Sequence, residues 1–315
     1  MKHISAQDIQ QCFSYEEFIP ELKQAFCANY VVPQRHHYEY ENGVGPNTST
    51  LLLMPAWSNG AFVGIKTVTV SPYNGEFDLP SIQGIYTLIN AKNGLIEALL
   101  EAKALTVKRT AAASALASSF LSREDAETLL MVGTGALAPE LIAAHCAVRS
   151  IKRVLIWGRS VGKSQDVIQK LNIDGIEVDP VDSIERGVGE ADIVSVATLS
   201  PTPLVFGKWL QSGQHLDMVG AYKPNMREAD DECLLRSSIF VDNTEGATKE
   251  TGDLAMPLKA GVITMSDIKA DLFQLAQGEK EGRSTANEIT FFKSVGHALE
   301  DLSAALYIMK KLKDE

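Results

Sequence analysis

The sequence is poor in cysteine, in metal-ligand patterns and in long apolar runs. Four cysteines are spread along 315 residues without a C-x-x-C pair, which predicts free thiols in a reducing cytoplasm. The six histidines show no ligand spacing, so we expect no metal site. Apolar stretches are too short to span a bilayer, and the N-terminus lacks the apolar core of a signal peptide. These absences predict a cytoplasmic protein with no membrane partner.

Positive charge is also scarce. Lysine and arginine total 29 against 40 aspartate and glutamate residues, which gives a net charge of −11. Such a chain repels phosphate backbones, so we expect no nucleic-acid partner. The hydrophobic fraction of 45% is typical of globular proteins, and the length gives room for two domains with ample cores.

Residues 129–138, which read LLMVGTGALA, form the most informative motif that is present. A short apolar run breaks into G-x-G-x-x-A and then into a helical pattern. Gly133 permits a tight turn, Gly135 lets the backbone approach a pyrophosphate, and Ala138 allows close helix–strand packing. A second apolar run at 154–157 follows about one βαβ unit later. The motif predicts a dinucleotide site; a purely structural strand–turn–helix is the alternative.

The end of the second predicted strand indicates which dinucleotide binds. NAD sites usually place a carboxylate there, on the ribose 2′-hydroxyl. This sequence instead has Arg159 and Ser160, with Lys163 one turn later and no carboxylate before Asp166. Arginine can hold a 2′-phosphate with two hydrogen bonds, so we expect NADPH, with NADH accepted less well. The alternative is a solvated arginine at a strand end.

The rest of the chain divides into two regions. Ser14 and Glu17 resemble a capping box before an amphipathic helix. Antiparallel strands are predicted at 50–54, 62–70, 82–90 and 95–100, with a turn at Asn93-Gly94. A helix at 110–120 then leads into alternating strands and helices. The strands of that second region are predicted at 129–132, 154–157, 176–178, 193–197, 215–219 and 239–241.

These patterns predict an α/β protein with two domains. Residues 1–113 would form an antiparallel α+β domain for substrate binding and dimerisation, and residues 114–291 a Rossmann-type dinucleotide-binding domain. A helical pattern at about 289–312 predicts a C-terminal helix. We assign residues 292–315, which contain most of that helix, to the first domain.

Two cations occupy unusual positions in the first region. Lys66 shares an apolar strand face with Val68 and Val70, where it needs a partner or must reach water. Arg109 is predicted in the first turn of an alanine-rich helix, where the helix dipole disfavours a cation. A bound carboxylate would relieve that conflict.

Five segments together resemble the ornithine cyclodeaminase/mu-crystallin family. They are GIK at 64–66, LTVKRTAAASA at 105–115, VGTG at 132–135, VGAYKPNMRE at 219–228 and ETGDL at 250–254. The resemblance implies a homodimer built through the N-terminal domain, and small amino, imino or keto acids as substrates. It implies that Arg35, Lys66 and Arg109 hold the substrate carboxylate. The cofactor-binding residues that we expect on this basis are Gly133, Thr134, Gly135, Ala136, Leu137, Arg159, Ser160, Lys163, Thr198, Val219 and Gly220.

One departure separates the subfamilies. Cyclodeaminases are expected to carry a catalytic aspartate where this chain has Tyr222, so deamination of ornithine would lack its acid/base group. The sequence is more similar to NADPH-dependent reductases of Δ1-pyrroline-2-carboxylate and Δ1-piperideine-2-carboxylate, which form L-proline and L-pipecolate. Lys66 or solvent would protonate the imine, and Ile82 or Gln83 would face the pocket.

Three alternatives stay open at this point. The chain could be an amino-acid dehydrogenase that forms alanine from pyruvate and ammonia. It could be a cyclodeaminase whose acid has moved, for example to Glu228 or Asp217. It could also be a nucleotide-dependent ligand-binding protein similar to mu-crystallin, because a fold does not decide a function.

Overall fold

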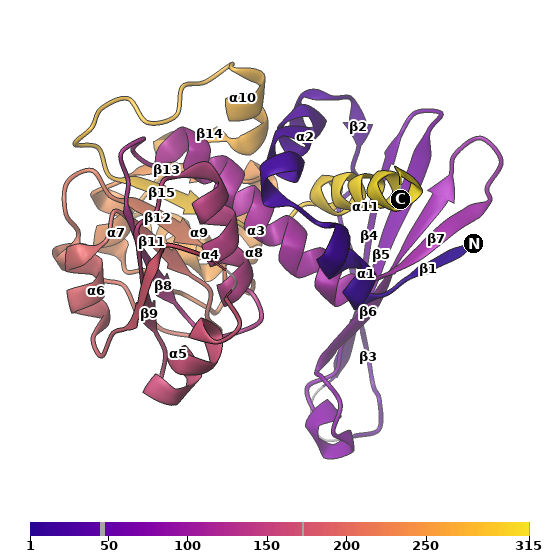
Figure 1. Ribbon diagram of the computed structural model, residues 1–315, viewed down its shortest axis with the longest axis horizontal. Helices are drawn as coiled ribbons and strands as arrows, with labels where there is room; N and C mark the ends of the chain where they lie inside the picture. Colours follow the sequence, from indigo (N-terminus) through magenta and orange to yellow (C-terminus); the bar gives the residue numbers. More distant parts are fainter. Residues whose placement is uncertain (45–47, 172, 315) are drawn as a thin grey trace. The chain divides into compact units, whose positions relative to one another are not determined.

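The computed structural model describes residues 1–44, 48–171 and 173–314 (Figure 1). The chain divides into two compact units. Unit 1 comprises Met1–Arg109 and His297–Glu315, and unit 2 comprises Thr110–Gly296. The first boundary lies inside helix α3 (Ala102–Leu121), four residues before the predicted one. No helix among the described residues is long and apolar enough to cross a membrane.

Unit 1 is built on a seven-stranded sheet with the order β1-β7-β6-β5-β4-β2, in which β3 also pairs with β4. All pairs are antiparallel except β1 with β7. Two strands occupy the predicted ranges, and β4 and β7 overlap theirs; β1, β2 and β3 were not predicted. The strands are β1 (Lys2–Ile4), β2 (Tyr30–Val31), β3 (His36–Tyr40), β4 (Ser49–Ser58), β5 (Phe62–Val70), β6 (Ile82–Asn90) and β7 (Ile96–Glu101).

Helices of unit 1 cover one face of this sheet. The helical elements are α1 (Ala6–Cys12), α2 (Tyr15–Cys27), the 3-10 helix η1 (Asn74–Phe77) and α11 (Ala298–Asp314). Helix α11 packs against β4, β5 and α2. The predicted capping box is only half formed: the Ser14 hydroxyl accepts the Glu17 N–H, but the Glu17 carboxylate accepts from Tyr307 of α11. The Tyr307 oxygen accepts the Ser14 N–H in its place. A contact distant in sequence therefore replaced the local one.

Unit 2 contains an eight-stranded parallel sheet with the order β10-β9-β8-β11-β12-β15-β13-β14. The first five strands follow the Rossmann order, with the chain reversing direction across the sheet between β8 and β11. All six predicted strands are present. The strands are β8 (Thr128–Val132), β9 (Arg153–Trp157), β10 (Glu177–Pro180), β11 (Ile193–Val196), β12 (His215–Met218), β13 (Ser238–Val241), β14 (Ile268–Asp271) and β15 (Thr290–Lys293).

Helices connect these strands. They are α4 (Ala138–Val148), α5 (Val161–Ile168), α6 (Ile184–Glu190), α7 (Asp231–Leu235), α8 (Thr244–Glu250), α9 (Gly252–Ala260) and α10 (Leu272–Gln277), with 3-10 helices η2 (Gly207–Trp209) and η3 (Met265–Asp267). The predicted helix at 289–312 is wrong in its first part, because β15 occupies Thr290–Lys293 and α11 begins at Ala298. Strand β15 is buried on both faces, so its sequence shows no alternation that would distinguish strand from helix.

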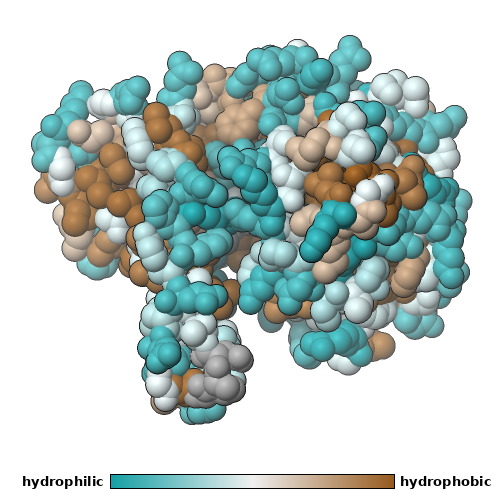
Figure 2. All heavy atoms as spheres, turned by 180° about the vertical axis from the view of Figure 1, so that it is seen from behind, coloured by the Kyte–Doolittle hydropathy of each residue, from teal (hydrophilic) through white to brown (hydrophobic). Residues whose placement is uncertain are grey.

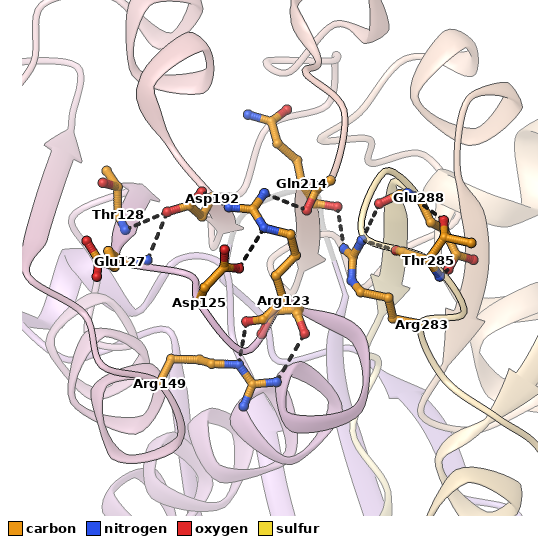
Figure 3. A network of polar contacts seen from close by, with 12 residues as sticks. Arg123, Asp125, Glu127, Thr128, Arg149, Asp192, Gln214, Arg283, Thr285 and Glu288 are labelled. Carbon is orange, nitrogen blue, oxygen red and sulfur yellow. Dashed lines mark hydrogen bonds and ion pairs between the residues drawn. The ribbon is translucent and has the colours of Figure 1, made fainter.

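Arginines fix the amino ends of the unit 2 strands (Figure 3). Arg283 donates to the backbone oxygens of Leu121, Gln214 and Glu288, which lie beside the starts of strands or at the end of α3. Arg149 donates to four carbonyls near the end of α3, and Arg123 pairs with Asp192 at 2.6 Å. These bonds add donors to carbonyls at helix ends and in loops, some of which also accept from a neighbouring residue.

Candidate active site

Lys66 projects from β5 on the sheet face that α11 covers. Its neighbours across the strands are Met54 and Tyr86. Only 3% of Lys66 is exposed, and its Nζ lies 2.9 Å from Oδ1 of Asp301, in the first turn of α11. Lys66 therefore does not reach water along the sheet but is paired inside the unit.

Arg109 binds the same carboxylate. Its Nε donates to Oδ1 of Asp301 at 2.8 Å, and its Nη1 donates to Glu300 at 2.6 Å. The remaining nitrogen, Nη2, makes no hydrogen bond to any residue that the structure describes. The guanidinium thus has one edge fixed by carboxylates and one nitrogen left to bind an anion.

The predicted position of Arg109 in its helix is wrong. Helix α3 begins at Ala102, so Arg109 lies in the third turn and the dipole at the helix start does not act on it. The Glu101 carboxylate accepts the N–H groups of Lys103 and Ala104 and holds the true start of the helix. The β-branched residues Thr106 and Val107 have a lower helix propensity than alanine, but they lie inside this helix.

Burial and charge set the protonation of this cluster. Burial and the positive charges of Arg109 and Arg35 lower the pKa of Lys66 to about 8, against the negative charge of Asp301. Burial would raise the pKa of Asp301, but Arg109 and Lys66 hold it below its usual range. The half-buried Arg35 lies between β2 and β3 in the chain, and its charge acts on Lys66, so the three predicted cations belong to one part of unit 1. With all five groups ionised, the cluster has one positive charge in excess, which suits a carboxylate ligand.

Sequence reasoning missed Glu300, Asp301 and Tyr86. The acidic pair precedes an apolar helical stripe, which is also how an ordinary helix start looks. Tyr86 is fully buried, and burial together with the Asp301 charge raises the pKa of its phenol, so it stays protonated. By strand alternation, Ile82 lies on the same sheet face as Lys66 and Tyr86, while Gln83 lies on the opposite face.

In unit 2, the glycine-rich turn after β8 leaves space for a phosphate group. Gly133 has φ +123°, and a Cβ there would lie 2.5 Å from the Ala197 oxygen, so only glycine fits. A Cβ on Gly135 would meet nothing, and Gly135 and Ala136 are exposed. Helix α4 follows with Leu137 as an N-cap that makes no side-chain cap. The Ala138 N–H donates to the Gly135 carbonyl and Pro139 has no N–H, so an anion here would be bound by N–H groups of the turn and not by the first residues of the helix.

The end of β9 is equally open. Arg159, Ser160 and Lys163 are all exposed. Ser160 is the N-cap of α5 but makes no capping hydrogen bond, and Arg159 bonds to none of the described residues. Thr134 lies against this loop, because a Cβ on Gly158 would be 2.6 Å from its Cγ2. These groups are available for a phosphate.

Thr198, Val219 and Gly220 lie after β11 and β12, and their donors are already engaged. The Glu228 carboxylate accepts the N–H and hydroxyl of Thr198 at 2.6 and 2.8 Å, and the N–H of Gly220 at 2.7 Å. The Val219 N–H donates to the Val196 carbonyl. Any cofactor contact of these residues must therefore use their carbonyl oxygens or apolar surface.

No carboxylate replaces the aspartate that a cyclodeaminase is expected to have. Tyr222 is 40% exposed, with the Lys223 amine 5.4 Å from its ring centre. Asp217 is fully buried and bonded to His145 and Ser195. Glu228 is also fully buried and tied to the backbone. Neither alternative carboxylate is exposed where it could take a proton from an amine.

The strand order and the glycine-rich turn define a Rossmann-type α/β protein. The profile of the ornithine cyclodeaminase/mu-crystallin family matches residues 4–315. Δ1-pyrroline-2-carboxylate reductase of Colwellia psychrerythraea is 36% identical over 317 residues, which cover 100% of both chains. The chain therefore belongs to the ornithine cyclodeaminase/mu-crystallin family, and the resemblance read from its motifs is confirmed.

Two solved structures share the whole fold. Thermococcus litoralis Δ1-pyrroline-2-carboxylate reductase, in complex with NADH and L-proline, has a TM-score of 0.91 and 32% identity, and covers 100% of this chain and 98% of its own. An archaeal alanine dehydrogenase dimer with bound NAD has a TM-score of 0.90 and 25% identity, and covers 99% and 96%. The predicted fold class, with a Rossmann-type domain beside a mostly antiparallel one, is confirmed.

Proposed function

We propose that this protein is an NAD(P)H-dependent imine reductase that converts Δ1-pyrroline-2-carboxylate to L-proline. Full-length similarity to reductases of that substrate supports the proposal. The six-membered analogue, Δ1-piperideine-2-carboxylate, carries the same carboxylate beside the same C=N bond, so we propose that it is reduced to L-pipecolate.

The unengaged nitrogen of Arg109 carries the proposal. Asp301 and Glu300 fix the guanidinium from one side, so Nη2 is directed without a further loss of side-chain freedom when a ligand binds. Together with Lys66 and Arg35 it would hold the substrate carboxylate. Fixing that carboxylate orients the adjacent C=N carbon for attack, which can supply several kcal/mol.

The reaction adds a hydride to C2 and a proton to nitrogen. When bound, the reduced nicotinamide supplies the hydride. The protonated imine is the better acceptor, and Lys66, whose pKa is about 8, carries a proton at neutral pH that it can donate to the ring nitrogen. No enzyme base is needed to remove an amine, which agrees with the exposed Tyr222 at the position of the cyclodeaminase acid.

We propose NADPH as the preferred cofactor, with NADH used less well. The turn from Gly133 to Leu137 would hold the pyrophosphate, and Arg159, Ser160 and Lys163 the 2′-phosphate. The support is that Arg159 and Ser160 are exposed and that neither side chain makes a hydrogen bond within the described chain.

We also propose a homodimer formed through unit 1. Large apolar side chains are exposed on β6, β7 and the preceding loops, and Figure 2 shows apolar side chains gathered over the sheet of this unit. A related archaeal enzyme is a dimer. Exposed apolar surface of this kind marks interfaces. The side chains concerned are Phe77, Leu79, Ile82, Ile85, Leu95 and Ile96.

An absorbance assay of NADPH and NADH oxidation tests the function. The panel is the two cyclic imines, pyruvate with ammonia, and ornithine with catalytic NAD(P)+. We expect rapid turnover of the cyclic imines only. Turnover of pyruvate with ammonia at a similar rate would make the protein an amino-acid dehydrogenase, and substantial proline from ornithine would make it a cyclodeaminase. Tight binding of imines without turnover would make it a binding protein.

A further inference from the structure

Glu228 is a fully buried carboxylate that joins two loops at the carboxyl edge of the unit 2 sheet. Its oxygens accept the N–H and hydroxyl of Thr198, after β11, and the N–H groups of Gly220 and Ala221, after β12. A Cβ on Gly220 would lie 2.1 Å from the Thr198 oxygen, so the two loops touch. The Glu228 carboxylate thus accepts four hydrogen bonds, more than are needed to close a single turn.

Among the described residues, Lys293 and Asp253 are the charged groups with the largest effect on Glu228. Lys293 of β15 has its Nζ 4.0 Å away, and Asp253 of α9 binds the Glu228 N–H at 2.8 Å. Lys293 and Asp253 pair at 3.0 Å, and all three side chains are fully buried. With every group ionised, the cluster has one negative charge in excess. An unbalanced buried charge is costly unless a proton or a cation compensates it.

The location of this charge matters. In a sheet of this order, the half that contains β8 and β9 binds the adenosine half of a dinucleotide, and the half that contains β11 and β12 takes the other nucleotide. Hydride transfer turns a neutral dihydronicotinamide into a pyridinium cation. A fixed negative charge at that edge stabilises the oxidised form more than the reduced form.

We infer that Glu228 is a positioning residue that also sets the redox preference of the nicotinamide end: it fixes the loops after β11 and β12, and its ionised form favours the oxidised cofactor. This inference rests on the proposed use of a nicotinamide cofactor. Burial and the negative charge of Asp253 raise the pKa of Glu228 to about 7, against the charge of Lys293 and the hydrogen bonds from Thr198, so the carboxylate titrates near neutrality.

The test is the ratio of the dissociation constants of NADP+ and NADPH, each measured by titration without substrate. Both forms carry the same 2′-phosphate and adenosine, so their own titration largely cancels in the ratio. In the wild type we expect binding of NADP+ relative to NADPH to tighten by about tenfold from about pH 6 to about pH 8. In Glu228→Gln the ratio should not change with pH.

Two further measurements separate this role from a general loss of structure. Binding of 2′,5′-ADP, which lacks the nicotinamide half, should be unchanged in Glu228→Gln, whereas an unfolded variant would lose it. Thr198→Val removes one hydrogen bond that favours the carboxylate, so its transition should move to higher pH. As a matched control, Asp217→Asn removes another fully buried carboxylate of the same sheet, and its ratio should follow the wild type.

The outcomes are distinct. A wild-type ratio that does not depend on pH, or a pH dependence that persists in Glu228→Gln, overturns the role of Glu228 and leaves the reductase proposal intact. A wild-type protein that binds no nicotinamide dinucleotide overturns both. A pH-dependent ratio that is lost only in Glu228→Gln and shifted in Thr198→Val supports the inference, whatever imine the enzyme reduces.

Discussion

Arg283 in unit 2 and Arg109 in unit 1 are both held by several hydrogen bonds, but they differ in how many guanidinium nitrogens remain without an acceptor. All three nitrogens of Arg283 donate, and all but one of the acceptors are backbone carbonyls (Figure 3). Arg109 donates through Nε and Nη1 to two carboxylates, and Nη2 has no acceptor among the described residues.

A third arginine completes the comparison. Arg159 is exposed and makes no hydrogen bond within the described parts of the chain. The number of engaged donors therefore falls from Arg283 to Arg109 to Arg159. An arginine with every donor satisfied inside the fold has nothing to offer a ligand, whereas a partly engaged one is both fixed and available. We expect the first to serve stability, the second substrate binding and the third cofactor choice.

The largest effect should come from removing the fully engaged arginine. Arg283→Met would leave the Glu288 carbonyl without its donor and would take one of two donors from the carbonyls of Leu121 and Gln214. Because five hydrogen bonds are lost together, we expect the free energy of unfolding to fall by about 3–5 kcal/mol. Urea denaturation measures this. Arg186→Met, on an exposed helix, is the control and should cost less than about 0.5 kcal/mol. A loss of similar size in both variants would contradict a special role for Arg283.

The carboxylate that holds Arg109 should matter next. Asp301→Asn removes the shared partner of Lys66 and Arg109 and leaves both cations less well placed, so kcat/KM for the cyclic imine should fall about a hundredfold, or ~2.7 kcal/mol. NADPH affinity should not change. Glu17→Gln, which alters another carboxylate bonded to α11, should change kcat/KM by less than about twofold. Near wild-type efficiency in a folded Asp301→Asn protein would remove this carboxylate from the site.

Replacing Arg159, the exposed arginine, should change only the use of the cofactor. Arg159→Asp places a negative charge beside the 2′-phosphate, so use of NADPH should weaken by roughly 2–3 kcal/mol while use of NADH is spared. Steady-state kinetics with each cofactor measure the difference. Equal losses with both cofactors would show that Arg159 supports the shared pyrophosphate or the fold.

Much of the fold could be read from local patterns, because most strands show their own periodicity. β5 and β6 lie at the predicted residues. The turn after β8 could be recognised from its glycines, which a tight turn requires. β15 could not be predicted in the same way, because a strand buried on both faces has the composition of a buried helix. Its state is decided by its neighbours β12 and β13 in the sheet.

The site was predictable only in part, for a related reason. Lys66 and Arg109 stood out because each was a cation in an apolar setting. Their partner Asp301 lies 192 residues after Arg109 and begins an ordinary-looking amphipathic helix. The local sequence does not show that an acidic residue at a helix start will form ion pairs with buried cations of other elements. Partners that only the tertiary fold brings together cannot be read from spacing.

A milder change at Arg109 tests whether its geometry or only its charge matters. Arg109→Lys keeps the positive charge but loses the planar guanidinium, whose separate nitrogens bind two carboxylates and leave Nη2 for a ligand. We expect kcat/KM with Δ1-pyrroline-2-carboxylate to fall at least about tenfold, or ~1.4 kcal/mol, with NADPH affinity almost unchanged. Wild-type efficiency in this variant would show that charge alone suffices.

The smallest effect concerns pH, and it distinguishes the lysine of the cluster from its arginine. A guanidinium keeps its proton at every working pH, whereas burial brings the pKa of Lys66 to about 8. The ammonium is present below that pKa and is lost above it, so kcat/KM should fall about fourfold between pH ~7 and ~8.5. In Lys66→Arg the charge no longer titrates. A decline that is unchanged in that variant would assign the titration to the free imine, whereas a flat profile at reduced rate would assign it to Lys66.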